Sequence, residues 1–186
     1  MTSFSFSKDQ LTSILPKRTQ SSNKGTYGRL LVIGGSDGMC GAPYFTAKAA
    51  YRSGVGLVEI FSSAENRIPL QTLIPEAVLT LYDARSVDLY SLEHSLERSD
   101  AVAIGMGLSQ NASSLEILKF TLENCKRPLL IDADALNLIS KNVSLFDPLK
   151  AIGDRAIITP HLMEMSRLIS REVDEIAKDV PAFASY

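Results

Sequence analysis

Short apolar runs recur along the chain and predict the strands of one sheet. Each run is a few residues long and nearly continuous in apolar character, and several of them begin 27 or 28 residues apart. Strands that are buried on both faces of a parallel sheet have this pattern. The predicted strands are residues 30–33, 57–61, 77–81, 101–104, 129–131 and 156–158.

Helical segments between these runs complete a pattern of repeated βαβ units. We therefore expect an α/β protein whose mostly parallel central sheet carries helices on both faces. A weak amphipathic pattern predicts one helix over residues 85–99. The signals for helix ends are Pro43 as a first residue, Gly54 just past a last residue, Ser113 as the start of a capping box, and Thr159 with Pro160 as cap and first residue.

Composition narrows the class of protein. The chain has 186 residues, a formal net charge of −2, 45% apolar residues and 22% charged residues, which is typical of a globular protein. This charge gives no overall attraction to nucleic acid, and no apolar run approaches the roughly 20 residues that span a bilayer. Two cysteines form neither a disulfide framework nor a zinc motif. We expect no nucleic-acid or membrane partner, no metal site in these residues and a cytoplasmic location.

The length predicts a single domain over residues 1–186. Residues 1–29 form a helix or loop lead-in, and 30–170 form the repeated βα units. The lead-in contains a basic stretch, 17–29, with four positive charges and no acid, which suits either a solvated loop or a loop that approaches phosphate. Because the chain ends directly after a helical segment, we expect an open sheet edge, an incomplete domain and aggregation of the 186-residue chain by itself.

Glycines that follow two predicted strands are candidate ligand contacts, because open α/β sheets bind ligands beyond the carboxyl ends of their strands. Residues 34–42 hold four glycines ahead of a helix, where bare amides and the helix dipole favour an anion. Gly105 and Gly107 follow the strand at 101–104. Both segments also suit plain tight turns, and the glycine loop has neither dinucleotide-binding nor Walker A spacing.

Polar residues follow the next two strands. Asp132 and Asp134 suit a cation or a ligand hydroxyl; alternatively, Asp134 caps a helix and Asp132 accepts from loop amides. His161 follows the last strand, at a helix start whose dipole favours the neutral imidazole. Its place at the same sheet edge makes it a candidate hydrogen-bonding group for a ligand, although a lone histidine is more often structural.

Taken together, these segments resemble one family. They are Lys24-Gly-Thr-Tyr-Gly28-Arg29, the glycine loop 34–42, the segment 49–56, Pro75-Glu76-Ala77, Ile104-Gly-Met-Gly107, Ile131-Asp-Ala-Asp-Ala-Leu-Asn137, and Thr159-Pro-His161 with Glu164. In this order they are similar to the ADP- or ATP-dependent NAD(P)H-hydrate dehydratases of the ribokinase-like superfamily, over residues 8–170. The ordered set is specific, whereas no single motif is.

The resemblance implies a ribokinase-like fold and a nucleotide-repair reaction. The family removes water from the S-epimer of hydrated NADH or NADPH (NADHX or NADPHX) at the expense of ADP or ATP, through phosphoryl transfer to the hydrate hydroxyl and loss of phosphate. Mg²⁺ is expected with the nucleotide, and relatives often form tetramers. The site residues are Ala42, Gly107 and His161 for the hydrate, with Gly41, Gly105, Asp132 and Lys24 as supporting candidates.

The chain departs from the family pattern in two ways. Leu162 and Met163 stand where the family usually has Pro-Gly, Met106 and Cys40 replace common prolines, and Ser109 replaces a frequent glycine. The Gly-Thr-Gly-Asp segment, which supplies the family's catalytic aspartate, does not occur in the chain. That aspartate is therefore expected beyond residue 186.

Two other functions fit the same residues. A kinase for a small alcohol, such as a vitamin precursor or a sugar, uses the same fold. The segment at Lys24 and the motif ending in His161 favour the dehydratase over this kinase. A non-catalytic nucleotide-binding or assembly module is the other alternative, because the catalytic segment is absent and Leu162 and Met163 replace the usual pair.

Overall fold

The computed structural model describes residues 7, 9, 10 and 18–183. The parts of the predicted lead-in at 1–6, 8 and 11–17, and the last residues, 184–186, lie outside these described residues. Among the helices of the described part, none combines the length and the apolar character required to cross a bilayer.

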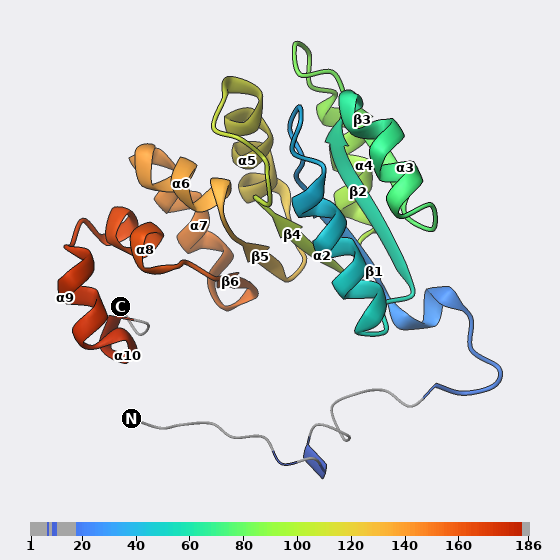
Figure 1. Cartoon of the computed structure of the whole chain (residues 1–186), viewed down its shortest axis with the longest axis horizontal. Coiled ribbons are helices and arrows are strands. Elements are labelled where there is room, and N and C mark those ends of the chain that lie inside the picture. Colours follow the sequence, from blue (N-terminus) through green and yellow to red (C-terminus); the bar gives the residue numbers. More distant parts are fainter. Residues whose placement is uncertain (1–6, 8, 11–17, 184–186) are drawn as a thin grey trace.

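One sheet of six parallel strands lies at the centre of the molecule (Figure 1). The strands are β1 (Arg29–Ile33), β2 (Leu57–Ser63), β3 (Val78–Tyr82), β4 (Ala101–Ile104), β5 (Leu129–Ile131) and β6 (Ala156–Ile158). All six predicted strands are confirmed, because helices bury the sheet and each strand therefore needs apolar residues on both faces. Their spatial order is β3-β2-β1-β4-β5-β6.

Helices connect the strands. The α-helices are α2 (Gly41–Arg52), α3 (Arg67–Leu73), α4 (Leu89–Arg98), α5 (Ala112–Asn124), α6 (Asp134–Lys141), α7 (Phe146–Ile152), α8 (Leu162–Ile169), α9 (Val173–Lys178) and α10 (Val180–Phe183). Short 3₁₀ segments are η1 (Lys24–Tyr27), η2 (Ala64–Asn66), η3 (Val143–Leu145) and η4 (Gly153–Arg155).

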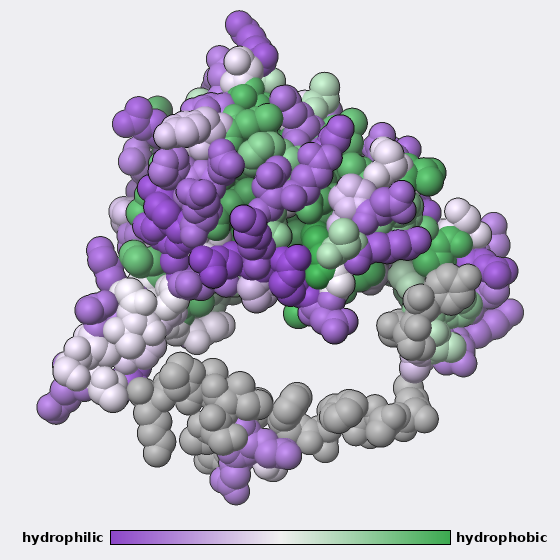
Figure 2. Space-filling model, turned by 180° about the vertical axis from the view of Figure 1, so that it is seen from behind, coloured by the Kyte–Doolittle hydropathy of each residue, from purple (hydrophilic) through white to green (hydrophobic). Residues whose placement is uncertain are grey.

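The strands contribute to two apolar cores, one on each face of the sheet. Val32 of β1 packs in a cluster with Ala47 of α2 and Leu70 of α3. Its neighbours Leu31 and Ile33 point the other way, into a cluster with residues of α4, α5, α6 and α7. The prediction of helices on both faces is confirmed. Figure 2, seen from behind, shows a surface on which hydrophilic side chains predominate.

The strand order reverses between β1 and β4, and this reversal positions the site. The chain leaves β1 through α2, whose Ala47 packs on one face, and leaves β4 through α5, whose Ile117 packs on the other. The loops that follow β1 and β4 therefore diverge toward opposite faces. Open α/β sheets bind ligands at this switch point, beyond the carboxyl ends of the two strands.

The ends of α2 and α5 differ in part from the predicted ones. Gly54 follows the end of α2 with a φ of +102°, as its predicted position requires. However, α2 begins at Gly41, so Pro43 is its third residue and not its first as predicted. Proline is tolerated at this position because the amides of the first helical turn have no hydrogen-bond partner inside the helix. At α5 the cap is Asn111, whose Oδ1 accepts from the amide of Ser114 at 2.9 Å. The predicted start of that helix, two residues later, is wrong.

The helix predicted over residues 85–99 is confirmed over a shorter range. Asp88 caps α4 by accepting from the amide of Ser91 at 3.1 Å. The residues just before it form a turn with an isolated bridge between Asp83 and Ser86. The bridge fixes these residues in a non-helical turn, so α4 begins at Leu89 and not at the predicted residue 85.

Strand β6 is an edge of the described sheet and exposes apolar side chains. Ile157 is 61% exposed and Ile158 is 41% exposed. A mainly apolar groove of about 420 Å³ runs beside it, where Thr46 and Ala49 of α2 face Leu130 of β5 and Ile157. An exposed apolar strand edge is a template for pairing with another chain.

Replacing Ile157 with lysine is expected to reduce self-association of the 186-residue chain, because a charge on an edge strand opposes pairing. Light scattering as a function of protein concentration measures this. The control is Ile68→Lys on α3, where an isoleucine that is 78% exposed lies on a helix instead of a strand edge. A monodisperse, cooperatively melting wild-type chain would contradict the expectation.

Candidate functional site

The loop that follows β1 is held by two buried side chains. Ser62 Oγ and Asn66 Nδ2 donate to the carbonyl oxygen of Gly35 at 2.8 and 2.7 Å, and Asn66 also donates to the carbonyl of Ser36 at 3.0 Å. Both side chains are buried, so water does not compete for these bonds. The loop backbone is thus fixed before any ligand arrives. Neither residue was predicted from the sequence, although Ser62 is a polar residue near the end of a buried strand.

The structure brings the predicted site residues Ala42 and Gly107 together. Gly107 has a φ of +64°, and a Cβ atom built on it would lie 3.2 Å from Ala42 Cβ and 3.0 Å from the carbonyl oxygen of Met39. The amide of Ser36 donates to the carbonyl of Gly107 at 2.7 Å, which joins the loops after β1 and β4. Small residues on both sides therefore let the two loops pack closely at the switch point, where Ala42 and Gly107 remain partly exposed.

Two supporting glycines have different roles. A Cβ atom on Gly105 would lie 1.9 Å from the carbonyl oxygen of Asp132, so this glycine is required by packing of the loop after β4 against the loop after β5. Gly41, the first residue of α2, has no atom within 4 Å of such a position and faces open space. Gly41 remains a candidate ligand contact, whereas packing accounts for Gly105.

The two aspartates after β5 hold backbone. Asp132 Oδ1 accepts from the amide of Ala133 at 2.8 Å. This agrees with the structural alternative to ligand binding, in which Asp132 accepts hydrogen bonds from loop amides. Asp134 is the first residue of α6 and not its cap, so that part of the alternative is wrong. Asp134 Oδ2 accepts from the amide of Ser109 at 2.8 Å, and Oδ1 accepts from Gln110 Nε2 at 3.1 Å. Ser109, at the frequent glycine position, has a φ of +70°, so this carboxylate holds a strained turn.

His161 caps α8. Its Nδ1 accepts from the amides of Met163 and Glu164 at 3.2 and 3.4 Å, and Glu164 Oε2 accepts from the amide of His161 at 3.0 Å. The predicted cap and first residue, Thr159 and Pro160, are therefore wrong, because this reciprocal capping box begins the helix two residues later. Since Nδ1 accepts, Nε2 carries the proton of the neutral ring.

His161 lies at the same sheet edge as Ala42 and Gly107, but not beside them in the strand order. It follows β6, and β5 separates β6 from β4. Its Nε2 lies 3.3 Å from Glu164 Oε1, and its side chain is 65% exposed. The ring nitrogen that is not used in capping thus remains accessible.

Lys24 lies at the opposite end of the sheet. It begins η1, and the carbonyl of Tyr27 in the same segment accepts from the amide of Gly56, just before β2. The structure therefore places Lys24 at the amino ends of β1 and β2, away from the loops that hold Ala42 and Gly107. Lys24 lines a groove of about 370 Å³ there, together with Arg18.

A small polar pocket lies at the carboxyl edge beside Gly107. Its volume is about 170 Å³, and loops after β1, β2, β3 and β4 all contribute to it. Ser36, which bonds Gly107, and Met39, which packs against it, connect the pocket to the predicted hydrate site. The lining residues are Ser36, Asp37, Met39, Ser63, Tyr82, Ala84, Ser109 and Asn111.

Tyr82 in this pocket is expected to make stability fall at alkaline pH. Burial, and secondly the charge of Asp37, raise the pKa of Tyr82 to about 12 from 10.0. As pH rises through this interval, the unfolded chain loses the phenol proton while the folded protein keeps it, so folding loses about 2–3 kcal/mol. Chemical denaturation from pH 9 to pH 12 measures the loss, relative to Tyr82→Phe as the control. Equal pH dependence in both proteins would contradict it.

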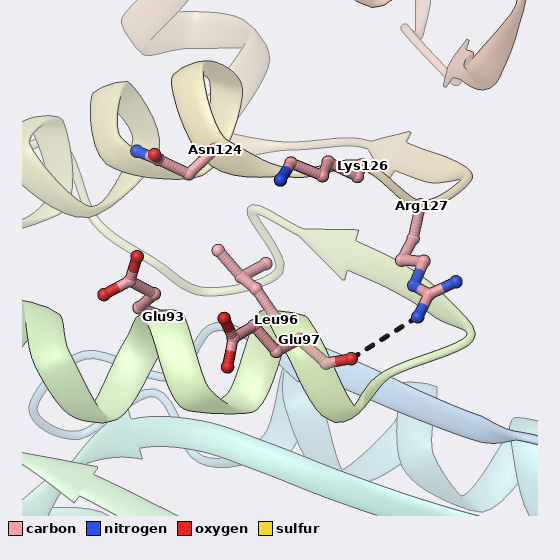
Figure 3. Close-up of a pocket in the computed structure, with 6 residues that line it drawn as sticks. All are labelled: Glu93, Leu96, Glu97, Asn124, Lys126 and Arg127. Atoms are coloured by element: carbon pink, nitrogen blue, oxygen red, sulfur yellow. Dashed lines mark hydrogen bonds between the residues drawn. The ribbon is translucent and has the colours of Figure 1, made fainter.

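A larger groove, of about 460 Å³, lies elsewhere, between α4 and the end of α5 (Figure 3). Acidic side chains such as Glu93 on α4 lie across from Lys126, and Arg127 Nη2 donates to the carbonyl of Glu97 at 3.4 Å. Mixed charges, and a place near the amino ends of β4 and β5 instead of their carboxyl ends, make it a solvated surface rather than the site. In the part of the chain that the structure describes, no three His, Cys, Asp or Glu side chains are grouped to hold a metal ion.

Comparisons with known sequences agree with the motifs. A family profile described as NAD(P)H-hydrate dehydratase matches residues 30–184. The bifunctional NAD(P)H-hydrate repair enzyme Nnr of Escherichia coli (strain K12) is 41% identical over 174 residues, which are 94% of this chain and 31% of that protein. The ADP-dependent (S)-NAD(P)H-hydrate dehydratase of Lactococcus lactis is 36% identical over 172 residues, 91% of this chain and 58% of that protein. The chain spans less than two thirds of either relative.

Solved structures confirm the predicted α/β, ribokinase-like fold. A ribokinase-like superfamily protein from Enterococcus faecalis matches with a TM-score of 0.78 at 27% identity, over 96% of this chain and 60% of that one. An ADP/ATP-dependent NAD(P)H-hydrate dehydratase from Bacillus subtilis, co-crystallised with ATP/Mg²⁺, matches with a TM-score of 0.70 at 29% identity, over 96% and 60% of the two chains.

Proposed function

Because the chain belongs to the NAD(P)H-hydrate dehydratase family, we propose that the whole protein removes water from the hydrated nicotinamide of NADH and NADPH at the expense of ADP or ATP. The observation that supports this most directly is the contact of Ala42 with Gly107. The two residues meet, partly exposed, at the switch point of the sheet, beside which open α/β proteins bind their ligands.

The reaction is a phosphoryl transfer followed by an elimination. The hydroxyl oxygen of the hydrate attacks the terminal phosphorus of the nucleotide, and the new O–P bond forms as the anhydride bond breaks. Phosphate then leaves with the C–O electron pair, and a proton leaves the neighbouring ring carbon to restore the double bond. The products are NADH or NADPH, phosphate, and AMP or ADP.

The residues of this chain bind and position the hydrate in this proposal. Backbone at Ala42 and Gly107 approaches the ligand closely, Gly41 adds an open helix start, and His161 donates a hydrogen bond from Nε2. The catalytic aspartate is assigned to a Gly-Thr-Gly-Asp segment outside this sequence. Lys24, at the far end of the sheet, has no role in this hydrate site.

Mg²⁺ accompanies the nucleotide phosphates in such transfers, where it neutralises charge on the leaving group. The described residues do not provide a carboxylate cluster for it, and Asp134 uses both oxygens to hold backbone and Gln110. No Mg²⁺ ligand is therefore assigned to this part of the chain.

The proposal extends to the state of the protein in solution. We infer a cytoplasmic homo-oligomer, a tetramer, that acts on a small molecule and binds neither nucleic acid nor membrane. Light scattering coupled to size-exclusion chromatography of the whole protein measures the mass, and a monomer would contradict the tetramer.

The test of the activity is recovery of reduced-nicotinamide absorbance from hydrated NADH, with ADP or ATP, by the whole protein. Gly107→Val is expected to lower kcat/KM by at least about tenfold, because displacing a bound ligand by about 1 Å can cost a hundredfold. The control Gly153→Val also has a positive φ but lies before β6, with open space around it. Release of a phosphorylated alcohol in place of NADH would favour the kinase instead.

A further inference from the structure

The polar pocket beside Gly107 is lined by a tyrosine whose hydroxyl group has no partner among the described residues. Tyr82 is only 3% exposed, and its ring stacks on Phe61 at a centroid distance of 5.1 Å. None of the described residues forms a hydrogen bond with its Oη. The ring is packed in place while the hydroxyl faces the pocket, where a bound ligand can replace water as its hydrogen-bond partner. A tyrosine hydroxyl is protonated at neutral pH, so Tyr82 can act as a donor there.

Asp37 faces the same space and is held in a fixed orientation. Its Oδ1 accepts from Ser63 Oγ at 2.5 Å, and Ser63 is buried. Asp37 and Tyr82 line this one small pocket, although no hydrogen bond joins the two. Asp37 Oδ2 has no hydrogen-bond partner in the described part of the chain. The pocket thus presents one fixed acceptor and one fixed donor.

This arrangement selects the charge and the polarity of the occupant. The lining residues include no lysine, arginine or histidine, and the Asp37 carboxylate repels a phosphate. The matching ligand group is uncharged and offers an N–H or O–H to the carboxylate and an oxygen to the phenol. A primary carboxamide has these two functions side by side on one planar group.

We propose that this pocket binds the carboxamide of the hydrated nicotinamide, with Tyr82 Oη donating to its carbonyl oxygen and Asp37 Oδ2 accepting from its N–H. The inference rests on the proposed function, which supplies the ligand. It makes Tyr82 and Asp37 specificity-determining residues, and Met39 connects them to the contact between Ala42 and Gly107.

The test is the affinity of the whole protein for hydrated NADH, measured by calorimetry without nucleotide so that catalysis is not required. Tyr82→Phe and Asp37→Asn are each expected to weaken binding by roughly fivefold to tenfold, the effect of one net hydrogen bond. A hydrate analogue with acetyl in place of carboxamide lacks the N–H donor. It is expected to bind the wild-type protein about tenfold more weakly, and Asp37→Asn is expected to reduce this difference because it removes the charged acceptor that the N–H meets.

The control is Tyr90→Phe, which removes a hydroxyl from an exposed tyrosine on α4 and leaves affinity unchanged. Equal affinity for the amide and acetyl analogues in all proteins would overturn the inference. It would also be overturned if Asp37→Asn changed only the affinity difference between the hydrate and an analogue that lacks a ribose hydroxyl, because Asp37 would then contact the ribose and not the carboxamide. Failure of the proposed function gives a different result: hydrated NADH binds with the expected discrimination, but neither ADP nor ATP supports its dehydration.

Discussion

Replacing Glu59 with alanine is expected to lower the free energy of unfolding by about 3–5 kcal/mol, as loss of one partner from a buried ionic group does. Glu59 lies on β2 and has no exposed surface. Its Oε1 accepts from Thr80 Oγ1 at 2.8 Å, Ser95 Oγ at 2.6 Å and Arg98 Nη2 at 3.3 Å. Arg29 Nε lies 3.9 Å from Oε2, and neither atom has a hydrogen-bond partner in the described residues.

The alanine variant leaves the Arg29 guanidinium, whose side chain is 24% exposed, without a counter-charge. Thermal melting is expected to show a midpoint lower by roughly 6–20 °C. Glu59→Gln keeps an acceptor for Thr80 and Ser95 and loses only the charge, so its decrease is smaller. The matched control Glu97→Ala, at an exposed position on α4, changes stability by no more than about 0.5 kcal/mol. A Glu59→Ala protein as stable as that control would show that water replaces the carboxylate.

The strands were predictable because one physical cause determines their residues. Val32 and Ile60 face one core while Leu31 faces the other, so a buried parallel strand admits almost no polar position. Glu59 is an exception inside such a run, and its charge is compensated by side chains from β1, β3 and α4. These partners are far from it in sequence, and no local pattern identifies them.

Helix starts were less predictable because each turn contains several residues that can cap. Near α5, both Asn111 and Ser113 have suitable side chains, and loop geometry decides between them. Near α8, the capping box uses His161 with Glu164, outside the usual serine or threonine pattern. The amphipathic pattern therefore locates a helix, but the direction from which the loop arrives sets its first residue.

The candidate site was predictable only in part, because the arrangement of strands and loops in space also decides which residues meet there. Ala42 and Gly107 were predicted from the resemblance to the family, with small residues after strands as support, and their contact follows from β1 and β4 being neighbours. Asp37, Ser63 and Tyr82 follow or end three different strands, and the strand order brings them together. That order depends on how the helices cross the sheet, which no spacing along the chain expresses.

Replacing Gly105 with alanine is expected to destabilise the fold by roughly 4 kcal/mol or more, from overpacking and backbone strain together. Its φ is +119°, and the new Cβ atom would lie 1.9 Å from the carbonyl oxygen of Asp132 and 2.8 Å from Ala135 Cβ. Both obstacles are rigid, since one is backbone and the other is a buried residue of α6. Chemical denaturation measures the loss.

Gly153→Ala separates the two causes. Gly153 also has a positive φ, +60°, with a ψ of −138°, but no atom lies within 4 Å of its Cβ position, so the variant is expected to lose only about 1–3 kcal/mol from backbone strain. The difference between the variants is the cost of the clash. If Gly105→Ala folds at all, the displaced turn moves Asp134, whose carboxylate holds the amide of Ser109, and hydrate binding weakens together with stability. Equal losses in the two variants would mean that the turn after β5 yields without strain and that packing does not require a glycine at position 105.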